Sequence, residues 1–330
     1  MDSTETAPDR FFGLLLAATA LPVIAFTMSD VALPDDPIAD QATIWVMFLG
    51  SSAHVAASFF FYSDSKMRQH MLGENRSRFL WAPLFLIAGT SALFSTGWPE
   101  VSYAIMFYWI WQTHHYTRQN HGILAFAGKA YGDPPNELER TALTLSGVGG
   151  VLGALTVLAP YRSTVLELYG WHVHQIALGT YSAGWLIYVV SLVRGRASRS
   201  GAHWMRTLMP VVLMLFYLPL FVFHDPRLAV GSYAMAHGLQ YLVFMGYVAS
   251  APREAFWHRA IGLVAFVALL GWGLEFLQRP KVFGDYRMAV FGAYLGVVMW
   301  HFLLDAGVWR LREPFQRGYM ADRFTFLKSS

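Results

Sequence analysis

Apolar residues fall in ten runs along the chain, separated by short polar segments. Each run is about 20 residues long, which is the length a helix needs to cross roughly 30 Å of hydrocarbon at about 1.5 Å per residue. Lipid cannot satisfy free backbone groups, and no alternating ten-residue pattern indicates a barrel. The pattern therefore predicts an all-α integral membrane protein, a single transmembrane domain over 1–330 with about ten helices. The predicted spans are 11–29, 43–63, 79–97, 101–121, 141–160, 172–194, 206–223, 230–249, 258–277 and 286–309.

The composition agrees with this fold class. Of the 330 residues, 55% are hydrophobic and only 14% are charged, outside the usual range of soluble domains. The lipid bilayer is the expected surrounding. A net charge of +3, spread along the chain, is too small and too dispersed to suggest nucleic-acid binding, so no nucleic-acid partner is expected. The absence of cysteine excludes disulfides, Cys-ligated iron–sulfur clusters and thiolate zinc sites, so any metal needs His, Asp or Glu.

The distribution of Lys and Arg predicts the orientation. With the amino terminus inside, all but five of the 24 basic residues fall in inner segments. The exceptions are Arg162, Arg227, Arg279, Lys281 and Arg287. The acidic start of the chain is unlike a secretory signal, so the run that begins at Phe11 is expected to remain as the first helix. Both termini are therefore expected in the cytoplasm.

Twelve histidines divide by their position in the spans. Six lie in loops or at helix ends and are expected to be interfacial or solvated: His70, His172, His174, His203, His224 and His258. The other six lie within four different spans: His54, His114, His115, His121, His237 and His301. An ionisable side chain at membrane depth is costly, which makes these six candidate functional residues.

Helical spacing turns each of these groups into a one-sided polar stripe. Asp305 follows His301 by four residues, and Tyr241 follows His237 by the same interval. His114, Arg118 and His121 also share a face. These faces are expected to point into the bundle. A single intramembrane histidine is commonly just a hydrogen-bonding residue between helices, but four helices that each contribute one favour a common buried metal or haem.

Signatures of several enzyme classes are missing, namely HExxH, GxSxG, a Walker loop and a helix-opening GxGxxG. The histidine pattern resembles the membrane-embedded, histidine-rich iron oxygenases and desaturases, and His114 and His115 with His121 approach one of their histidine boxes. It is closer in style to the bacterial carotene-cleaving dioxygenases of Brp/Blh type, with isolated histidines on several spans. His54, His237, and His301 with Asp305 correspond in kind.

The resemblance implies an iron-dependent oxygenase, hydroxylase or desaturase of a bacterial inner membrane. Its partners would be a lipophilic small-molecule substrate that reaches the site from the bilayer, and an electron donor. The expected ligands are His54, His114 or His115, His237 and His301. Asp305 would bind the metal or orient a ligand, and His121 would be a further ligand of a dinuclear centre. Tyr241 or Gln240 would move a proton or orient oxygen, while Arg118 would reach the lipid headgroups.

Three other functions remain open on the sequence. Facing histidine pairs could hold haem b in an electron-transfer protein. The His and Asp stripe could be a relay in a transporter or proton channel. The ligands could also hold zinc in a membrane hydrolase or transferase.

Overall fold

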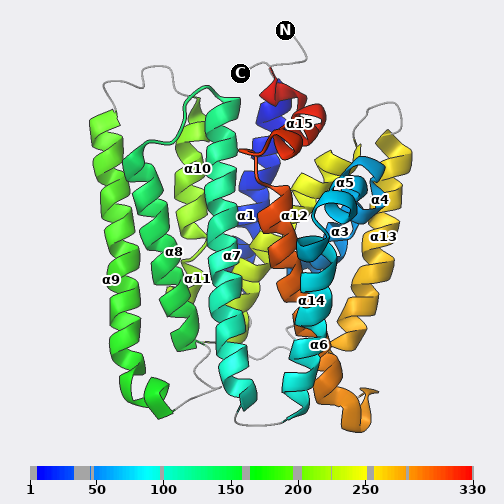
Figure 1. Cartoon of the computed structure of the whole chain (residues 1–330). Coiled ribbons are helices and arrows are strands. Elements are labelled where there is room, and N and C mark those ends of the chain that lie inside the picture. The colour runs from blue at the N-terminus through cyan, green and yellow to red at the C-terminus, as the bar shows by residue number, and fades with distance from the viewer. Residues whose placement is uncertain are drawn as a thin grey trace. The chain divides into compact units, whose positions relative to one another are not determined.

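The computed structural model describes residues 6–32, 45, 48–96, 100–157, 164–195, 203–223, 225–250, 256–279 and 282–328. These residues are almost entirely helical, and no strand occurs among them (Figure 1). Seven helical stretches in this part are long and apolar enough to cross a membrane: Ala7–Met28, Ser77–Ser95, Glu137–Val157, His172–Gly195, Trp204–Val222, His258–Leu277 and Gly284–Val308. The chain is thus an all-α integral membrane protein, as the hydrophobic pattern predicts.

Three of the ten predicted spans are not among these seven. The spans 101–121 and 230–249 lie in two long helices, α7 (Glu100–Ala130) and α12 (Pro226–Ser250), in which polar residues interrupt the apolar ones. The span 43–63 forms several short helical pieces, and its residues 43, 44, 46 and 47 lie outside the described part. The number ten and the cytoplasmic position of both termini stay predictions.

The chain divides into two compact units. Unit 1 comprises residues 1–40, 109–240 and 325–330, and unit 2 comprises residues 41–108 and 241–324. The boundaries fall within α7 and α12, so each of these helices contributes residues to both units.

Unit 1 is built around closely packed helices. Glycines allow α8 (Glu137–Val157) and α9 (Thr164–Gly195) to lie side by side (Figure 1). A Cβ added to Gly149 would lie 2.8 Å from the Ala177 carbonyl oxygen, a distance that only glycine permits. The unit also contains α1 (Thr6–Ala32), α10 (Trp204–Leu215), α11 (Pro219–Val222) and the carboxyl-terminal turn Thr325–Leu327.

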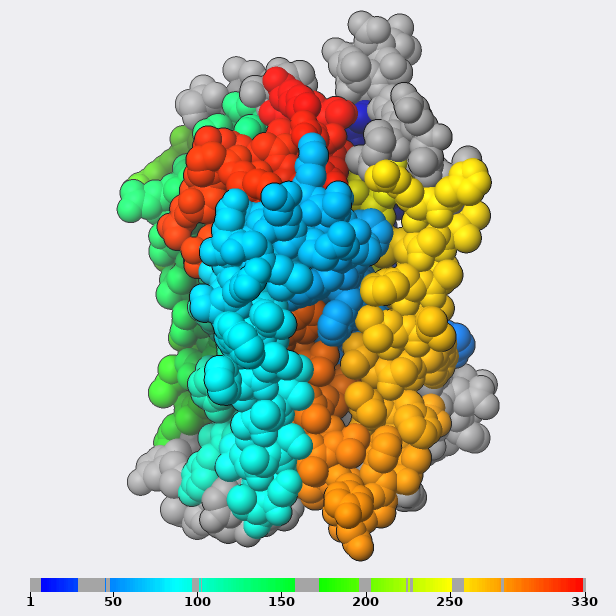
Figure 2. Space-filling view, turned by 45° about the vertical axis from the view of Figure 1, so that its right-hand side comes forward, coloured from blue at the N-terminus to red at the C-terminus, as the bar shows by residue number. Residues whose placement is uncertain are grey.

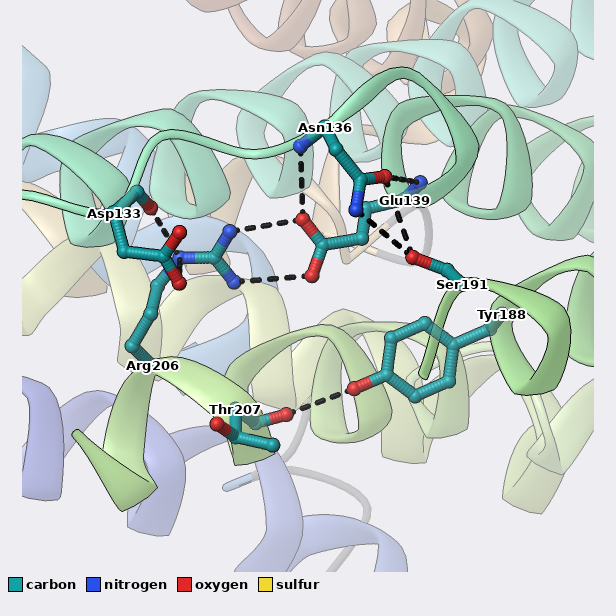
Figure 3. A network of polar contacts seen from close by, with 7 residues as sticks. All are labelled: Asp133, Asn136, Glu139, Tyr188, Ser191, Arg206 and Thr207. Atoms are coloured by element: carbon teal, nitrogen blue, oxygen red, sulfur yellow. Dashed lines mark hydrogen bonds and ion pairs between the residues drawn. The ribbon is translucent and has the colours of Figure 1, made fainter. Parts of the chain in front are cut away.

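A buried ion pair joins three elements of unit 1 (Figure 3). The Arg206 guanidinium on α10 donates to the Glu139 carboxylate on α8 at 2.9 and 3.3 Å, and both side chains are fully buried. Arg206 also donates to the Asp133 carbonyl oxygen at 2.7 Å. Asn136 and Glu139 cap the start of α8 reciprocally, and the Asn136 amide donates to Ser191 on α9. The network fixes the ends of α8, α9 and α10.

Unit 2 contains a segment of irregular helix followed by regular ones. Residues Phe48–Ala53 form wide, π-helical turns that lead directly into the short helix α3 (His54–Ser58). A glycine allows α6 (Ala82–Ser95) to pack tightly against α14 (Arg287–Val308), because a Cβ on Gly292 would lie 2.5 Å from the Thr90 carbonyl oxygen. The remaining elements are α4 (Phe60–Ser63), α5 (Ser65–Gln69), the π-helical turns His70–Glu74 and Ser77–Trp81, α13 (Phe256–Leu277), the 3₁₀ turn Gly284–Tyr286 and α15 (Pro314–Arg323).

The last helix of unit 2 covers the segment that follows α4. Figure 2 shows α15, in red, against the blue residues of α5 and the turns after it. Arg323 donates to the Asp64 carboxylate at 2.7 Å and lies over the Tyr319 ring. The His70 ring stacks on Phe315 with centroids 4.0 Å apart. His70, expected to be interfacial, therefore has a local packing role.

Candidate metal centre

Unit 2 brings together two of the predicted ligands, His54 on α3 and His301 on α14. Their ring centroids lie 4.9 Å apart, and a nitrogen of each lies within 4.8 Å of one of the other. Both side chains are buried, with exposed fractions of 2% and 0%. Two imidazoles at this separation can bind one transition-metal ion, because each contributes a neutral nitrogen ligand.

A chain of hydrogen bonds surrounds His301. The Ser58 hydroxyl lies 2.6 Å from His301 Nδ1 and donates to the Tyr241 hydroxyl at 3.0 Å. Tyr241 donates in turn to Asp305 Oδ1 at 2.9 Å. The other carboxylate oxygen, Oδ2, lies 3.6 Å from His301 Nε2. Asp305 and Tyr241 were predicted from the sequence, whereas Ser58 was not.

Local helix geometry explains why these residues meet. Ser58 follows His54 by one turn on α3, and Asp305 follows His301 by one turn on α14, so each helix presents both members of its pair on one face. The wide turns just before His54 also place Ser51 and Ser52 against unit 2 partners, since Ser51 bonds to Tyr294 at 2.6 Å. Wide turns of this kind occur frequently at functional sites.

Unit 1 contains a second histidine pair, His115 on α7 and His237 on α12. Their ring centroids lie 5.1 Å apart, and both side chains are buried. Tyr116 stacks on His237 with ring centroids 3.9 Å apart, and the Gln112 amide donates to the Tyr116 hydroxyl. The Tyr116 ring thus stacks on this pair, whereas in unit 2 the Tyr241 ring lies edge-on to His301, with centroids 5.1 Å apart, and a hydroxyl and a carboxylate lie beside the histidine.

Gln240, predicted as a catalytic residue, links helices of unit 1. Its amide oxygen accepts from Gln119 on α7 at 2.9 Å, and its amide nitrogen donates to Thr19 on α1 at 2.8 Å. Both ends of the side chain therefore contribute to packing, and its role in proton transfer stays a prediction.

The stripe of His114, Arg118 and His121 does not point inward as a whole. His114 and Arg118 are exposed, because His115 occupies the buried face and its neighbour in the sequence is turned by about 100° around the helix axis. The expectation of an inward-facing His114 is therefore wrong. His121 is half-buried and lies 3.2 Å from the Thr144 hydroxyl on α8.

His203 and His224 are two of the six histidines that were expected in loops or at helix ends. His203 lies 3.3 Å from the Asp9 carboxylate and stacks on Tyr131, which places it in a local polar contact of unit 1. Burial and the hydrogen bond to Asp9 raise the pKa of Tyr131 above its ordinary value, so this tyrosine stays a hydroxyl donor. His224 lies outside the described residues.

The donors in unit 2 fit a transition metal better than a hard cation. Two buried imidazoles with one carboxylate are the ligand types of iron and zinc sites, whereas Mg²⁺ and Ca²⁺ prefer oxygen ligands. Hydrogen-bonded residues behind a ligand are typical of such centres, because they fix the orientation of the ring. The prediction that all four helices contribute to one centre stays a prediction.

Comparison with known protein families, with curated proteins and with solved structures found no match.

Proposed function

We propose that this chain is a metal-dependent oxidoreductase of the bacterial inner membrane, an oxygenase, hydroxylase or desaturase of lipidic substrates. The observation that carries the proposal is the buried pair of His54 and His301 with Asp305 one turn away on α14. Charged and polar groups are expensive inside a membrane protein, and they are retained there chiefly where they have a function. The proposal includes ten membrane spans with both termini in the cytoplasm.

The residues of unit 2 divide the work in this proposal. His54 and His301 would hold the metal, and Asp305 would bind it or orient His301. Iron bound by such ligands supplies the activation of dioxygen that oxidation of an unactivated carbon requires. Tyr241 bonds to both Ser58 and Asp305, so its hydroxyl is in position to pass a proton between them. An electron donor would be a further partner.

The apolar surroundings favour a lipidic substrate. Large hydrophobic side chains on α13 and α6, among them Leu269 and Phe85, are exposed on the outside of unit 2, as expected where helices contact lipid. A water-soluble substrate would have to cross this surface, whereas a lipidic one dissolves in the same medium. Unit 1 has a pair of the same ligand type, His115 and His237.

Metal analysis of the purified protein tests the proposal. We expect iron to copurify with the wild type, and His54→Ala and His301→Ala to lose most of it. The loss of affinity should exceed the roughly 10–100-fold cost of removing a residue that only orients a ligand. His70→Ala and His203→Ala are matched controls, because these rings have partners elsewhere, and they should retain the metal.

Other results of the same preparation separate the alternatives. Equal metal content in all these variants contradicts the site. Zinc without iron supports a hydrolase or transferase, and a Soret band supports a haem-b protein.

One observation favours a second candidate, a proton pathway. Ser58, Tyr241 and Asp305 form a continuous chain of hydrogen bonds next to His301, and such chains conduct protons in membrane proteins. A proton channel should acidify proteoliposomes after complete removal of metal by a chelator, and Asp305→Asn should stop it. Under the oxidoreductase proposal the metal-free protein moves no protons.

A further inference from the structure

Two arginines of unit 2 lie at the ends of two helices that are long and apolar enough to cross a membrane. Arg78 is the second residue of the stretch Ser77–Ser95, and Arg310 follows the stretch Gly284–Val308 by two residues. We propose that this arginine pair binds the phosphate group of an anionic phospholipid. The inference goes beyond the proposed function, because it needs neither a metal nor the histidine pairs.

Backbone contacts hold both guanidinium groups against the last turns of α14. Arg78 donates through Nε and Nη2 to the Leu303 carbonyl oxygen, at 3.2 and 3.1 Å. Arg310 donates through Nε to the Ala306 carbonyl oxygen at 2.8 Å. Leu303 and Ala306 are three residues apart and are therefore neighbours on the surface of the helix. The two cations are thus held near each other.

A glycine of α14 makes room for Arg78. A Cβ added to Gly307 would lie 3.0 Å from Arg78 Nε and 2.5 Å from Phe79 Cζ. A side chain at position 307 would therefore displace the guanidinium from its place over the helix.

No carboxylate compensates the charge of the pair. Arg310 lies near enough to Arg78 to repel its guanidinium. Acidic side chains of the neighbouring segments have other partners, namely His70 for Glu74, Arg312 for Glu313 and Arg323 for Asp64. In the part of the chain that the structure describes, no acidic side chain forms an ion pair with Arg78 or Arg310. Two like charges held in this way favour the binding of an anion.

The arginines also keep hydrogen-bond donors for such an anion. A guanidinium has five N–H groups, of which Arg78 uses two and Arg310 one on the carbonyl oxygens, so three and four are left. Its planar geometry matches two oxygens of a phosphate, and these charge-assisted bonds are stronger than bonds between neutral groups. The donor set therefore suits a phosphate.

An apolar surface for the chains of a lipid begins three residues after Arg78. Trp81, Leu84 and Phe85 have exposed fractions of 52%, 50% and 75%. In Figure 2 the cyan surface of α6 continues from the blue turns in the direction away from α15. Tryptophan is enriched at the level of the headgroups, and apolar side chains beyond it contact acyl chains. A basic pair that adjoins an apolar surface fits a phospholipid better than a free phosphate ion.

Binding of phosphatidylglycerol to the full-length protein in detergent tests the proposal. The protein is titrated with this anionic lipid, and native mass spectrometry measures the number of lipids bound and their affinity. Phosphatidylcholine is the comparison lipid, because its headgroup has no net charge. We expect one tightly bound phosphatidylglycerol per chain, with an affinity at least about tenfold above that of phosphatidylcholine.

A variant of the exposed arginine locates the site. Arg310→Gln leaves the contact of Arg78 with Leu303 in place, so the variant should fold as the wild type does. We expect it to weaken phosphatidylglycerol binding at least about tenfold, as the loss of a hydrogen bond between charged groups predicts. Arg287→Gln is the matched control, because Arg287 is an exposed arginine at the opposite end of α14, about 30 Å away, and it should leave the affinity unchanged.

Each outcome decides the proposal without reference to the metal. Equal affinities for the two lipids, or equal losses in Arg310→Gln and Arg287→Gln, overturn it. Displacement of the lipid by an equal concentration of inorganic phosphate indicates a site for a free anion and overturns the assignment to a phospholipid. Selective loss in Arg310→Gln, with no displacement by phosphate, supports the lipid site even where the protein contains no iron, which would contradict only the proposed function.

Discussion

The two units each bury a histidine pair, but they surround it differently. In unit 2, His301 lies within 4 Å of a serine hydroxyl and a carboxylate, while in unit 1, His237 lies under the ring of Tyr116. The charged residues show the opposite distribution. Unit 1 has a fully buried ion pair at the ends of its helices, whereas the Arg323–Asp64 pair of unit 2 is partly exposed. Unit 1 thus uses buried charge for its scaffold, and unit 2 places it beside the candidate ligands.

The largest effect is expected from breaking the scaffold of unit 1. Arg206→Ala leaves Glu139 buried without its guanidinium, and loss of one partner of such a pair costs about 3–5 kcal/mol. Unfolding followed in detergent by circular dichroism measures it. Arg118→Ala is the matched control, because this exposed arginine of the same unit should change stability by less than about 0.5 kcal/mol. Equal effects of the two substitutions on the free energy of unfolding would show that the buried ion pair adds no more stability than an exposed arginine.

A smaller effect should follow from removing the charge beside the unit 2 pair. Asp305→Asn keeps the size of the side chain, and we expect the affinity for Fe²⁺ or Zn²⁺ to fall about 10–100-fold, which corresponds to roughly 1.4–2.8 kcal/mol. Competition with a chromogenic chelator measures this affinity. Gln119→Ala alters a neutral neighbour of His237 in unit 1 and should leave it unchanged. If both substitutions lower the metal affinity equally, the proposed difference between the two histidine pairs is wrong.

The smallest effect is expected at the ion pair of unit 2. Arg323→Gln removes a partly exposed contact with Asp64 and a cation–π contact with Tyr319, which together stabilise by about 1 kcal/mol. Thermal unfolding at low salt should show this loss. Because salt screens exposed charges, the difference should shrink near 1 M salt, whereas the effect of Arg206→Ala should persist. A loss as large as that of Arg206→Ala would remove the distinction drawn between the two ion pairs.

The sequence predicted the helical fold because hydrophobic run length is a local property. It also identified His54, His301 and Asp305 as buried, since polar residues within apolar runs are visible without a structure. Ser58 was missed although it follows His54 by four residues, the spacing that was used to pair His301 with Asp305. Applying that spacing to small hydroxyl residues would have found it.

Other features depended on contacts between distant residues. Arg206 is the first residue of the predicted span 206–223, and only the structure pairs it with Glu139, 67 residues away. The inward orientation expected for His114 was wrong, because the face of α7 that packs against other helices cannot be derived from the positions of polar residues alone. The side of a helix that is buried depends on its neighbours, which are set by the folded chain.

The π-helical turns of Phe48–Ala53 make the candidate site sensitive to chain length. A wide turn contains one residue more than an α-helical turn needs. Deleting a single residue there would restore regular winding, in which each residue turns by about 100° around the axis, so the residues within the segment would change their angle relative to His54. Ser51 and Ser52 would then turn away from Tyr294 and Glu275, although no ligand had been altered. Homologous chains that share this centre should therefore conserve the number of residues in this segment more strictly than their identity.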